Sequence, residues 1–434
     1  METSVESIAI RAREHTEEKF TALMHHFSEE NLRSCFDSLK GNKAVGVDGI
    51  TKDNYQEKLD ENLINLVKGL KQMSYKPQPV RRVEIPKEDG KVRPLGISCI
   101  EDKIIQEMTR RILEAIYEPV FMVTSYGFRR GRNCHDALRR LNLEIMTKPV
   151  NWVVDLDISQ FFDAMPHDKI LEILQERIGD RKLLRLIVRM LKAGVQTPSD
   201  VLYDELGSPQ GSVVSPIIAN IFLHKVIDQW FSEVLKSYFD GYCEIIRYAD
   251  DVVAVFEREE DARKFMKVLP LRLAKFGLKL NETKTRMVAF GKRLAHQSQK
   301  QGKHMETFDF VGFTHFWGKS LKGKSKVKRK TSKKRLQRAL KALNHWISEE
   351  RHSLCQTDKW LILASKIRGH FNYFGVSDNM PSLERFNGRV RRILLRWLNR
   401  RSQRKSFTWE SFNEYLKRYP LPKPCIKVNL NPVW

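Results

Sequence analysis

The sequence contains no long uninterrupted run of apolar residues. No segment approaches the roughly 18 to 20 consecutive apolar residues that a membrane-spanning helix needs. Residues 1–22 alternate acids, bases and threonine and lack the apolar segment of a secretory signal. With 41% hydrophobic residues, the chain can still build sizeable cores. We therefore expect a soluble, cytoplasmic protein, and its 434 residues predict at least two packed units.

Cysteine is scarce and scattered. The six cysteines form no C-x-x-C pair and follow no regular spacing. This argues against a disulfide framework and against a structural zinc site. We expect free thiols in a reducing compartment.

The net charge of +24 is concentrated in the last quarter of the chain. Residues 321–434 hold 28 Lys and Arg against 7 Asp and Glu, a net charge of +21, whereas the other 320 residues carry a net charge of only +3. Aromatic residues, including Trp346, Trp360 and Trp397, lie among these bases. Basic side chains neutralise phosphates and aromatic rings stack on unpaired bases. We expect a nucleic-acid partner and no membrane; a solubilising surface is the alternative.

Hydrophobic periodicity predicts a mixed α+β chain. Helices are expected over residues 1–40, 54–73, 101–117, 167–175, 182–193, 215–234 and 261–276. Strands are expected over residues 152–158, 287–290 and 308–316, and hairpins over residues 80–94 and 244–256. Residues 319–334 are rich in Gly, Ser and Lys, which predicts a domain boundary or a flexible loop facing nucleic acid. Amphipathic stretches beyond them predict a basic helical bundle.

The most informative motif is Tyr248-Ala249-Asp250-Asp251, which lies between two apolar, β-prone runs. Adjacent carboxylates at a hairpin tip repel each other and are costly without a cation. Mg²⁺ would relieve this repulsion, because it prefers carboxylate and phosphate oxygens as ligands. A lone Asp-Asp pair is usually a solvated turn, but two flanking hydrophobic strands favour a metal site.

A second source of carboxylates lies in the expected strand 152–158. Asp155 and Asp157 alternate there and therefore share one face of the strand. If this strand lies beside the hairpin of Asp250, three carboxylates surround two metal ions, which is the arrangement for in-line nucleotidyl transfer. One ion would activate the attacking 3′-hydroxyl, and the other would hold the triphosphate.

Together, the motifs resemble the reverse transcriptase blocks of bacterial group II intron-encoded proteins. In the order of that family, the chain contains RVEIPKEDGKVRPLGI, SYGFRRGRN, VVDLDISQFFDAMPH, GSPQGSVVSPIIANIFL, RYADD, GLKLNETKT and FVGF. The joint match is specific and covers roughly residues 30–316. IRGHFNYFGV is similar to the family's maturase or thumb segment, with His370 where Trp is common. No Cys pairs of an HNH endonuclease follow residue 405.

The resemblance implies a right-hand polymerase, with fingers and an antiparallel palm sheet followed by a basic α-helical thumb. The units expected are an N-terminal helical extension (1–29), fingers (30–150), palm (151–316), thumb or maturase domain (317–405) and C-terminal tail (406–434). The implied activity is extension of a DNA primer with dNTPs on an RNA template. Binding of the parent intron RNA as a maturase is implied beside it. The alternatives are a splicing maturase with secondary polymerase activity and a domesticated enzyme of DNA repair, phage defence or a CRISPR locus.

The resemblance also assigns the metal-binding residues. Asp157, Asp250 and Asp251 match the family's catalytic carboxylates, which bind two Mg²⁺, with Mn²⁺ as a possible substitute. Asp157 is preferred over Asp155 because the aromatic sugar gate lies five residues after the metal-binding Asp, where this chain has Phe162. Phe162 would stack under the deoxyribose and leave no room for a 2′-hydroxyl, whereas Phe161 is expected in the core.

The resemblance also assigns residues that bind the incoming nucleotide. Lys87 and Arg93 match finger residues that hold the triphosphate, where a point charge and a forked donor suit phosphate. Gln210 matches a loop residue near the incoming sugar, and Gly211 allows close approach of the backbone. Lys284 matches a lysine that protonates the leaving pyrophosphate; Lys279 and Lys292 are alternatives.

Two segments are assigned to the primer and the template. Phe310, Val311 and Gly312 resemble the primer-gripping turn. Arg129, Arg130 and Arg132 would lie along the template, although a basic surface loop explains them equally well.

Overall fold

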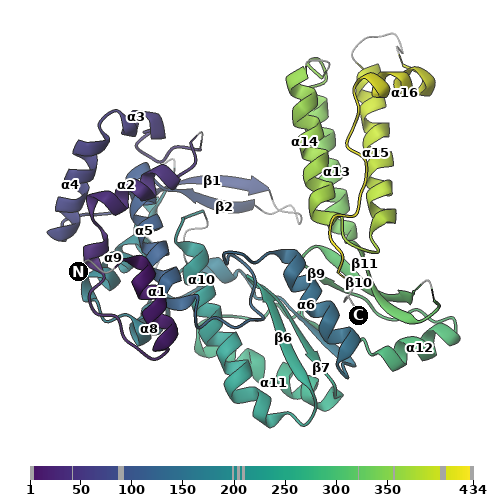
Figure 1. Ribbon diagram of the computed structural model, residues 1–434, viewed down its shortest axis with the longest axis horizontal. Coiled ribbons are helices and arrows are strands. Elements are labelled where there is room, and N and C mark those ends of the chain that lie inside the picture. Colours follow the sequence, from purple (N-terminus) through teal and green to yellow (C-terminus); the bar gives the residue numbers. More distant parts are fainter. Residues whose placement is uncertain are drawn as a thin grey trace.

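The computed structural model describes residues 4–41, 43–86, 92–197, 200–202, 206–207, 211–320, 322–354, 357–400 and 407–430. Figure 1 shows the N-terminal helices on one side, a sheet in the middle and a group of long C-terminal helices rising on the other side. None of the described helices combines the length and the apolar character that crossing a membrane requires. The five described cysteines are free thiols.

The N-terminal region is helical and packs around one central helix. Its helices are α1 (Val5–Glu14), α2 (Glu29–Ser38), α3 (Lys52–Gln56), α4 (Leu59–Lys71) and α5 (Ile100–Tyr117). Both α1 and α2 pack on α5, which is buried along most of its length. The continuous helix predicted over residues 1–40 is wrong between α1 and α2, where only the short turn η1 (Met24–His26) is helical.

The hairpin predicted over residues 80–94 is confirmed. Strand β1 (Val80–Pro86) pairs antiparallel with β2 (Val92–Ile97), and its other edge meets β4 (Val195–Gln196) and then β5 (Val201–Leu202). The Asp89-Gly90 turn and Lys87 lie outside the described residues.

The central sheet is antiparallel throughout, in the order β6-β7-β3-β8. Its strands are β3 (Trp152–Leu156), β6 (Cys243–Tyr248), β7 (Asp251–Phe256) and β8 (Arg286–Ala289). Alternation of side chains divides the strands between two cores. Val154 and Ala254 pack into the core shared with α5, whereas Val153 and Val253 pack into the core shared with the C-terminal helices.

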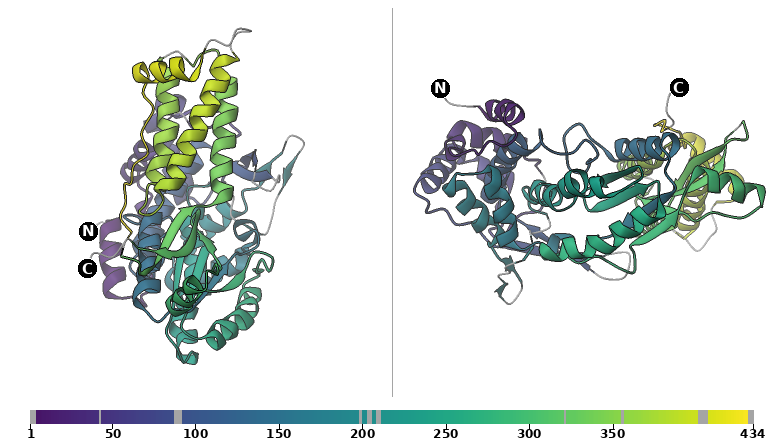
Figure 2. Two further views of the ribbon diagram at one scale, coloured as in Figure 1. Left: turned by 90° about the vertical axis from the view of Figure 1, so that its right-hand side faces the viewer. Right: turned by 90° about the horizontal axis from the view of Figure 1, so that it is seen from below.

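Helices cover both faces of this sheet (Figure 2). α6 (Cys134–Thr147) packs on β6, and α11 (Glu259–Lys275) packs on β3 and β7. The other helices of this part of the chain are α7 (Phe161–Ala164), α8 (His167–Arg177), α9 (Arg181–Leu191), α10 (Ser215–Leu223) and α12 (Lys292–Lys300). α10 continues as the π-helix η2 (His224–Val234) and the short turn η3 (Leu235–Tyr238). The sequence did not predict α6, although Asn133 starts it with a capping box.

The flexible loop predicted over residues 319–334 is wrong, because half of this segment is strand and its last residues begin a helix. β9 (Phe308–Phe310), β10 (Phe313–Lys319) and β11 (Ser325–Thr331) form an antiparallel sheet in the order β11-β10-β9. In β11, Val327 and Arg329 are buried while Lys328 and Lys330 point outward. The expected palm–thumb boundary at residue 316 falls inside β10.

The C-terminal helices form the basic bundle that the sequence predicted. They are α13 (Lys333–Glu349), α14 (Thr357–Phe374), α15 (Met380–Asn399) and α16 (Trp409–Arg418). Leu336, Leu340 and Ile347 form the buried stripe of α13. After α16 the chain returns to the central core, where Leu430 is buried and its carbonyl accepts a 2.9 Å hydrogen bond from Nδ2 of Asn142 on α6.

His370 on α14 is buried in an aromatic cluster. Its ring stacks on Phe386 at a centroid distance of 3.7 Å and lies 4.7 Å from the ring of Phe374. Desolvation lowers the pKa of His370 to about 4. The ring is therefore neutral near pH 7, as its aromatic surroundings require.

His370→Phe should stabilise the protein in acid. The folded pKa lies below the unfolded value of 6.5, so stability is present above pH 6.5 and is lost as the pH falls toward 4. The variant should exceed the unsubstituted protein by roughly 2 to 3 kcal/mol at pH 4 and by much less at pH 7. Urea unfolding across this pH range measures the difference; a gap that does not change with pH would refute a neutral, buried His370.

Candidate active site

The tip of the β6–β7 hairpin is held in a single conformation by close packing. Tyr248 pairs with Asp251, so Ala249 and Asp250 form the turn, with Ala249 in the left-handed region at φ +56°. Gly127, from the SYGFRRGRN segment, lies directly against it. A Cβ on Gly127 would come within 2.2 Å of the Ala249 nitrogen, so this position requires glycine.

Asp157 lies directly after β3 and is fixed by the segment that precedes β8. Its backbone carbonyl accepts a 2.8 Å hydrogen bond from the Asn281 N–H. Its Oδ2 accepts hydrogen bonds from Nδ2 of Asn281 at 2.7 Å and from Nζ of Lys284 at 3.2 Å. Lys284 was predicted near the triphosphate, and the structure places its ammonium on the Asp157 carboxylate. Asn281 was missed, although it lies within the GLKLNETKT motif.

Strand register brings Asp157 next to the hairpin tip. Leu156 pairs with Val252, which places Asp157 opposite Asp251 on the same face of the sheet. Desolvation and repulsion by Asp250 and Asp157 raise the pKa of Asp251 to about 6, although Arg335 and the Val311 N–H oppose this change. Solvent still reaches the Asp251 side chain, so the crowded carboxylate remains accessible to a ligand.

Asp155 lies in the same group of carboxylates, one step further into the sheet. It forms an ion pair with Arg286, with Nε and Oδ2 3.7 Å apart, and its side chain is 22% exposed. Burial raises its pKa to about 7, against the influence of Arg286, and Asp251 and Asp309 repel it. Arg286 offsets only part of the cost of burying Asp155, whereas Asp157, directly after the strand, has a side chain that is 36% exposed.

The donor set fits Mg²⁺ in its chemistry. Asp157, Asp250 and Asp251 offer only hard carboxylate oxygens, and the raised pKa of Asp251 reports uncompensated negative charge that a cation would relieve. Within the described parts of the chain, no three acidic, His or Cys side chains converge closely enough to form a ready-made metal site. The Asp157 carboxylate is instead turned toward Asn281 and Lys284.

The expected sugar gate follows Asp157 on α7. Phe161 is 3% exposed, so its expected place in the core is confirmed. Phe162 is half-buried, and its ring lies 5.3 Å from that of Phe161 in a T-shaped arrangement. Gly207 backs this segment, since a Cβ there would lie 3.1 Å from the Phe162 carbonyl oxygen.

The other residues expected at the nucleotide are only partly described. Lys87 and Gln210 lie outside the described residues, and for Arg93 the structure describes only the backbone, which pairs with Ile85 in the β1–β2 hairpin. Gly211 has φ +111°, and a Cβ there would lie 2.7 Å from the Gly96 carbonyl oxygen. The loop before α10 therefore approaches β2 closely, which only glycine permits.

The expected primer-gripping turn joins β9 and β10 beside the carboxylates. Val311 and Gly312 both have positive φ, +45° and +82°, which is costly for a β-branched residue. The Val311 N–H donates to the Asp251 carboxylate. The Val311 carbonyl accepts a 3.0 Å hydrogen bond from the Tyr373 hydroxyl on α14. The turn thus links an acid of the site to the C-terminal helices.

The template role expected for Arg129 is wrong. Its side chain is 2% exposed and pairs with Glu118 at 2.7 Å, and its guanidinium also donates to the carbonyls of Met122 and Ser125. Arg132 likewise donates to a backbone carbonyl, that of Val123. Arg130 points outward, with its side chain 77% exposed.

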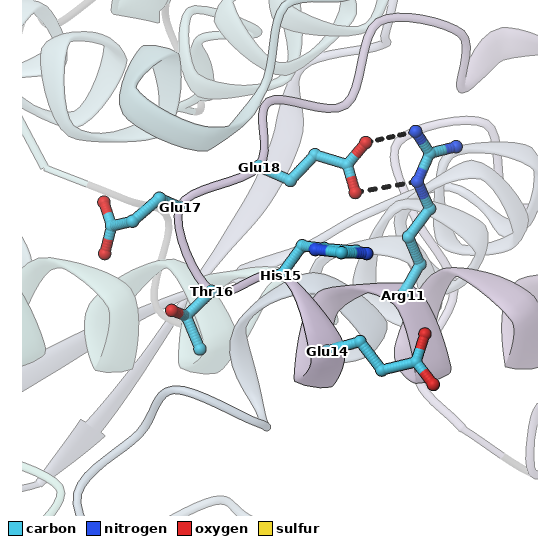
Figure 3. Close-up of a pocket in the computed structure, with 6 residues that line it drawn as sticks. All are labelled: Arg11, Glu14, His15, Thr16, Glu17 and Glu18. Carbon is cyan, nitrogen blue, oxygen red and sulfur yellow. Dashed lines mark hydrogen bonds and ion pairs between the residues drawn. The ribbon is translucent and has the colours of Figure 1, made fainter.

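A pocket of about 640 Å³ lies apart from the carboxylates, at the end of α1 (Figure 3). The residues that line it are Arg11, Glu14, His15, Thr16, Glu17 and Glu18. Arg11 and Glu18 form an ion pair across it. The pocket therefore adds no acidic side chain to the carboxylates at the end of the central sheet.

Asp251→Asn should raise the melting temperature in buffer without divalent cations, because it removes repulsion by Asp250 and Asp157. The gain is expected to be on the order of 1 kcal/mol. Adding Mg²⁺ should raise the melting temperature of the unsubstituted protein and leave the variant nearly unchanged. Thermal unfolding with and without Mg²⁺ measures both effects.

Asp240→Asn, at a side chain that is 65% exposed, is the control and should respond to Mg²⁺ as the unsubstituted protein does. Equal Mg²⁺ shifts for all three proteins would contradict a metal site at Asp251.

Residues 85–315 match a family model described as reverse transcriptase (RNA-dependent DNA polymerase). Group II intron-encoded protein LtrA of Lactococcus lactis is 37% identical over 238 residues, which are 54% of this chain and 39% of that protein. An uncharacterized 91 kDa protein in a cob intron of Schizosaccharomyces pombe is 40% identical over 48% of this chain and 25% of its own length. Protein YkfC of Escherichia coli is 37% identical over 45% of this chain and 52% of its own length.

The matched part of the chain thus spans between a quarter and about half the length of these relatives. The family model covers more than half of the chain and contains the β3 strand, the YADD turn and the segment around Lys284. The resemblance to group II intron-encoded proteins drawn from the motifs is confirmed by LtrA. The chain belongs to the reverse transcriptase (RNA-dependent DNA polymerase) family.

Proposed function

We propose that this protein extends a DNA primer with dNTPs on an RNA template by two-metal nucleotidyl transfer. The observation that carries the proposal is the placement of Asp157, after β3, opposite Asp251 on one face of the sheet, with Asp250 next to Asp251 in the β6–β7 turn. Like charges are concentrated there at an accessible position, and the Asp251 pKa is raised. Carboxylates in this arrangement suit a phosphoryl-transfer site better than a structural role.

In this proposal Asp157, Asp250 and Asp251 hold two Mg²⁺, with Mn²⁺ as a substitute. The ions, when bound, supply Lewis-acid chemistry for the 3′-hydroxyl and the triphosphate. Lys284 holds Asp157 through Oδ2, and its side chain is 63% exposed. The ammonium can therefore leave the carboxylate and donate a proton to the departing pyrophosphate.

The remaining site residues take roles around the nucleotide and the primer. Phe162, half-buried against Phe161, would form the floor under the deoxyribose and exclude a 2′-hydroxyl. Lys87, Arg93 and Gln210 would bind the triphosphate and the sugar. Phe310, Val311 and Gly312 would grip the primer terminus, since their turn lies against Asp251 and α14.

The same proposal divides the chain into functional units. The N-terminal extension (1–29) and the fingers (30–150) would be the units to the N-terminal side of the palm sheet and the thumb (317–405) the unit on the other side, although α6 of the fingers packs on strand β6 of the palm (Figure 1). The palm (151–316) holds the carboxylates, and the tail (406–434) returns to α6. Because β10 and β11 form one hairpin, the junction between palm and thumb extends to the start of α13.

Asp250→Asn should abolish primer extension. The substitution removes one metal-binding oxygen and leaves the hairpin backbone in place, so the rate should fall by more than about a hundredfold. Extension of a DNA primer on an RNA template measures the effect, and Asp240→Asn, outside the site, should retain full activity. Substantial extension by Asp250→Asn at matched purity and unchanged folding would defeat the two-metal proposal.

A second function, binding of a parent group II intron RNA as a maturase, is favoured by the charge of the C-terminal quarter. The net charge is +21 after residue 320 and +3 before it. Exposed lysines follow the β10–β11 hairpin into α13, including Lys322, Lys324, Lys330 and Lys334. A domesticated enzyme in DNA repair or defence remains the alternative, and it would use the same surface for another RNA.

Neutralising Lys322, Lys324, Lys330 and Lys334 to Gln should flatten the salt dependence of RNA binding. Each phosphate contact contributes nearly one unit to the slope of log affinity against log salt, so the slope should drop by about two to four units. The loss should be similar for unrelated RNA sequences, because phosphate contacts carry little sequence information.

The matched control removes four exposed lysines from the fingers side, Lys40, Lys58, Lys68 and Lys71. It changes the net charge equally and should alter the slope much less. RNA affinity measured at several salt concentrations separates the two proteins. An unaltered slope in the first variant, or equal changes in both, would show that this surface does not bind phosphate.

A further inference from the structure

A buried ion pair lies behind the turn that carries Asp250 and Asp251. The side chains of Arg247 and Asp228 are 1% and 2% exposed. Nε of Arg247 donates to Asp228 Oδ1 at 2.8 Å, and Nη2 donates to Oδ2 at 2.6 Å. This forked geometry is the strongest form of an arginine–carboxylate pair. Nothing in the proposed chemistry uses either residue.

The third nitrogen of Arg247 reaches the catalytic turn itself. Nη1 donates to the carbonyl oxygen of Ala249 at 3.1 Å and to Oδ1 of Asn220 at 2.9 Å. Nδ2 of Asn220 in turn donates to the Gly127 carbonyl at 2.7 Å. Gly127 is the residue whose backbone lies directly against the Ala249 nitrogen. Ala249 is therefore held at its carbonyl by Arg247 and at its nitrogen side by Gly127.

The helix that contains Asp228 is of an unusual type. It lies in η2, an 11-residue π-helical segment that continues α10. π-Helical turns are rare and often occur at functional sites. The segment is buried at Asp228, and α10 carries Asn220, so one continuous helix presents both partners of Arg247.

The ion pair has little value as a general stabiliser. Desolvation of two charges offsets most of their attraction, and apolar residues of similar volume often pack as stably. The turn, by contrast, needs support, because Ala249 has φ +56°. Such a backbone persists only where the surroundings over-determine it.

We propose that Arg247, oriented by Asp228, is a positioning residue that sets the catalytic turn through the Ala249 carbonyl. That the turn carries catalytic carboxylates, those of Asp250 and Asp251, rests on the proposed function. Its effect on the turn itself does not, so the two can be tested separately.

The first variant replaces both residues of the ion pair, Arg247→Met with Asp228→Leu, so that no unpaired charge stays buried. Arg247→Lys is the second variant: it keeps the charge facing Asp228 but loses the fork that also reaches Ala249. Arg177→Met is the matched control. Arg177 is also buried and also donates to a backbone carbonyl, that of Ile116 at 3.0 Å, away from the turn.

Two measurements are made on each variant. Hydrogen exchange of residues 248–252 reports the turn without any catalysis, and it should quicken by at least about tenfold in both Arg247 variants while the amides of α5 stay protected. Single-turnover nucleotide incorporation by the folded fraction should slow by about a hundredfold, with little change in the KM for dNTP or primer–template. Arg177→Met should change neither quantity beyond its effect on stability.

Unchanged exchange at residues 248–252 in both Arg247 variants would overturn the proposal. So would faster exchange combined with an unchanged rate in the folded fraction, because the pair would then not set the carboxylates. If the unsubstituted protein extends no primer at all, the proposed function fails, and the exchange measurement still decides whether Arg247 holds the turn.

Discussion

The repulsion between carboxylates at the end of the central sheet is the constraint on which the structure depends. Asp157 is far in sequence from Asp250 and Asp251, and the pairing of β3 with β7 places it opposite Asp251 on one face of the sheet. Desolvation and repulsion by Asp250 and Asp157 raise the pKa of Asp251 to about 6, so unfavourable negative charge is concentrated at this position. The surrounding structure must hold these groups together against that repulsion.

It does so by burying both faces of the sheet and by contacts to the backbone or the carboxylate of the acids. The sheet separates two hydrophobic cores, one shared with α5 and the other with the C-terminal helices. Asn281 holds the Asp157 carbonyl, Val311 donates to Asp251, and Gly127 packs against the turn. Because Tyr373 of α14 bonds to Val311, the C-terminal helices take part in the same arrangement.

Much of this could be predicted from sequence, because strong local patterns carried it. The YADD tip lies between two apolar strands, and alternation placed Asp157 on the same face as Asp155. The strand β11 was missed because its Lys, Gly and Ser composition resembles a loop, although Val327 and Arg329 alternate with lysines as in a half-buried strand. Contacts such as that of Asn281 with Asp157 depend on tertiary packing, which no local pattern encodes.

In the proposed function Asp157, directly after β3, and not Asp155, inside β3, completes the metal site with the YADD acids. Single-turnover nucleotide incorporation by Asp157→Asn and Asp155→Asn, measured over a range of Mg²⁺ concentrations, tests it most directly. Asp157→Asn should eliminate incorporation at every Mg²⁺ concentration, whereas Asp155→Asn should retain it within about tenfold. Loss of incorporation in Asp155→Asn together with activity in Asp157→Asn would show that Asp155 is the metal-binding residue.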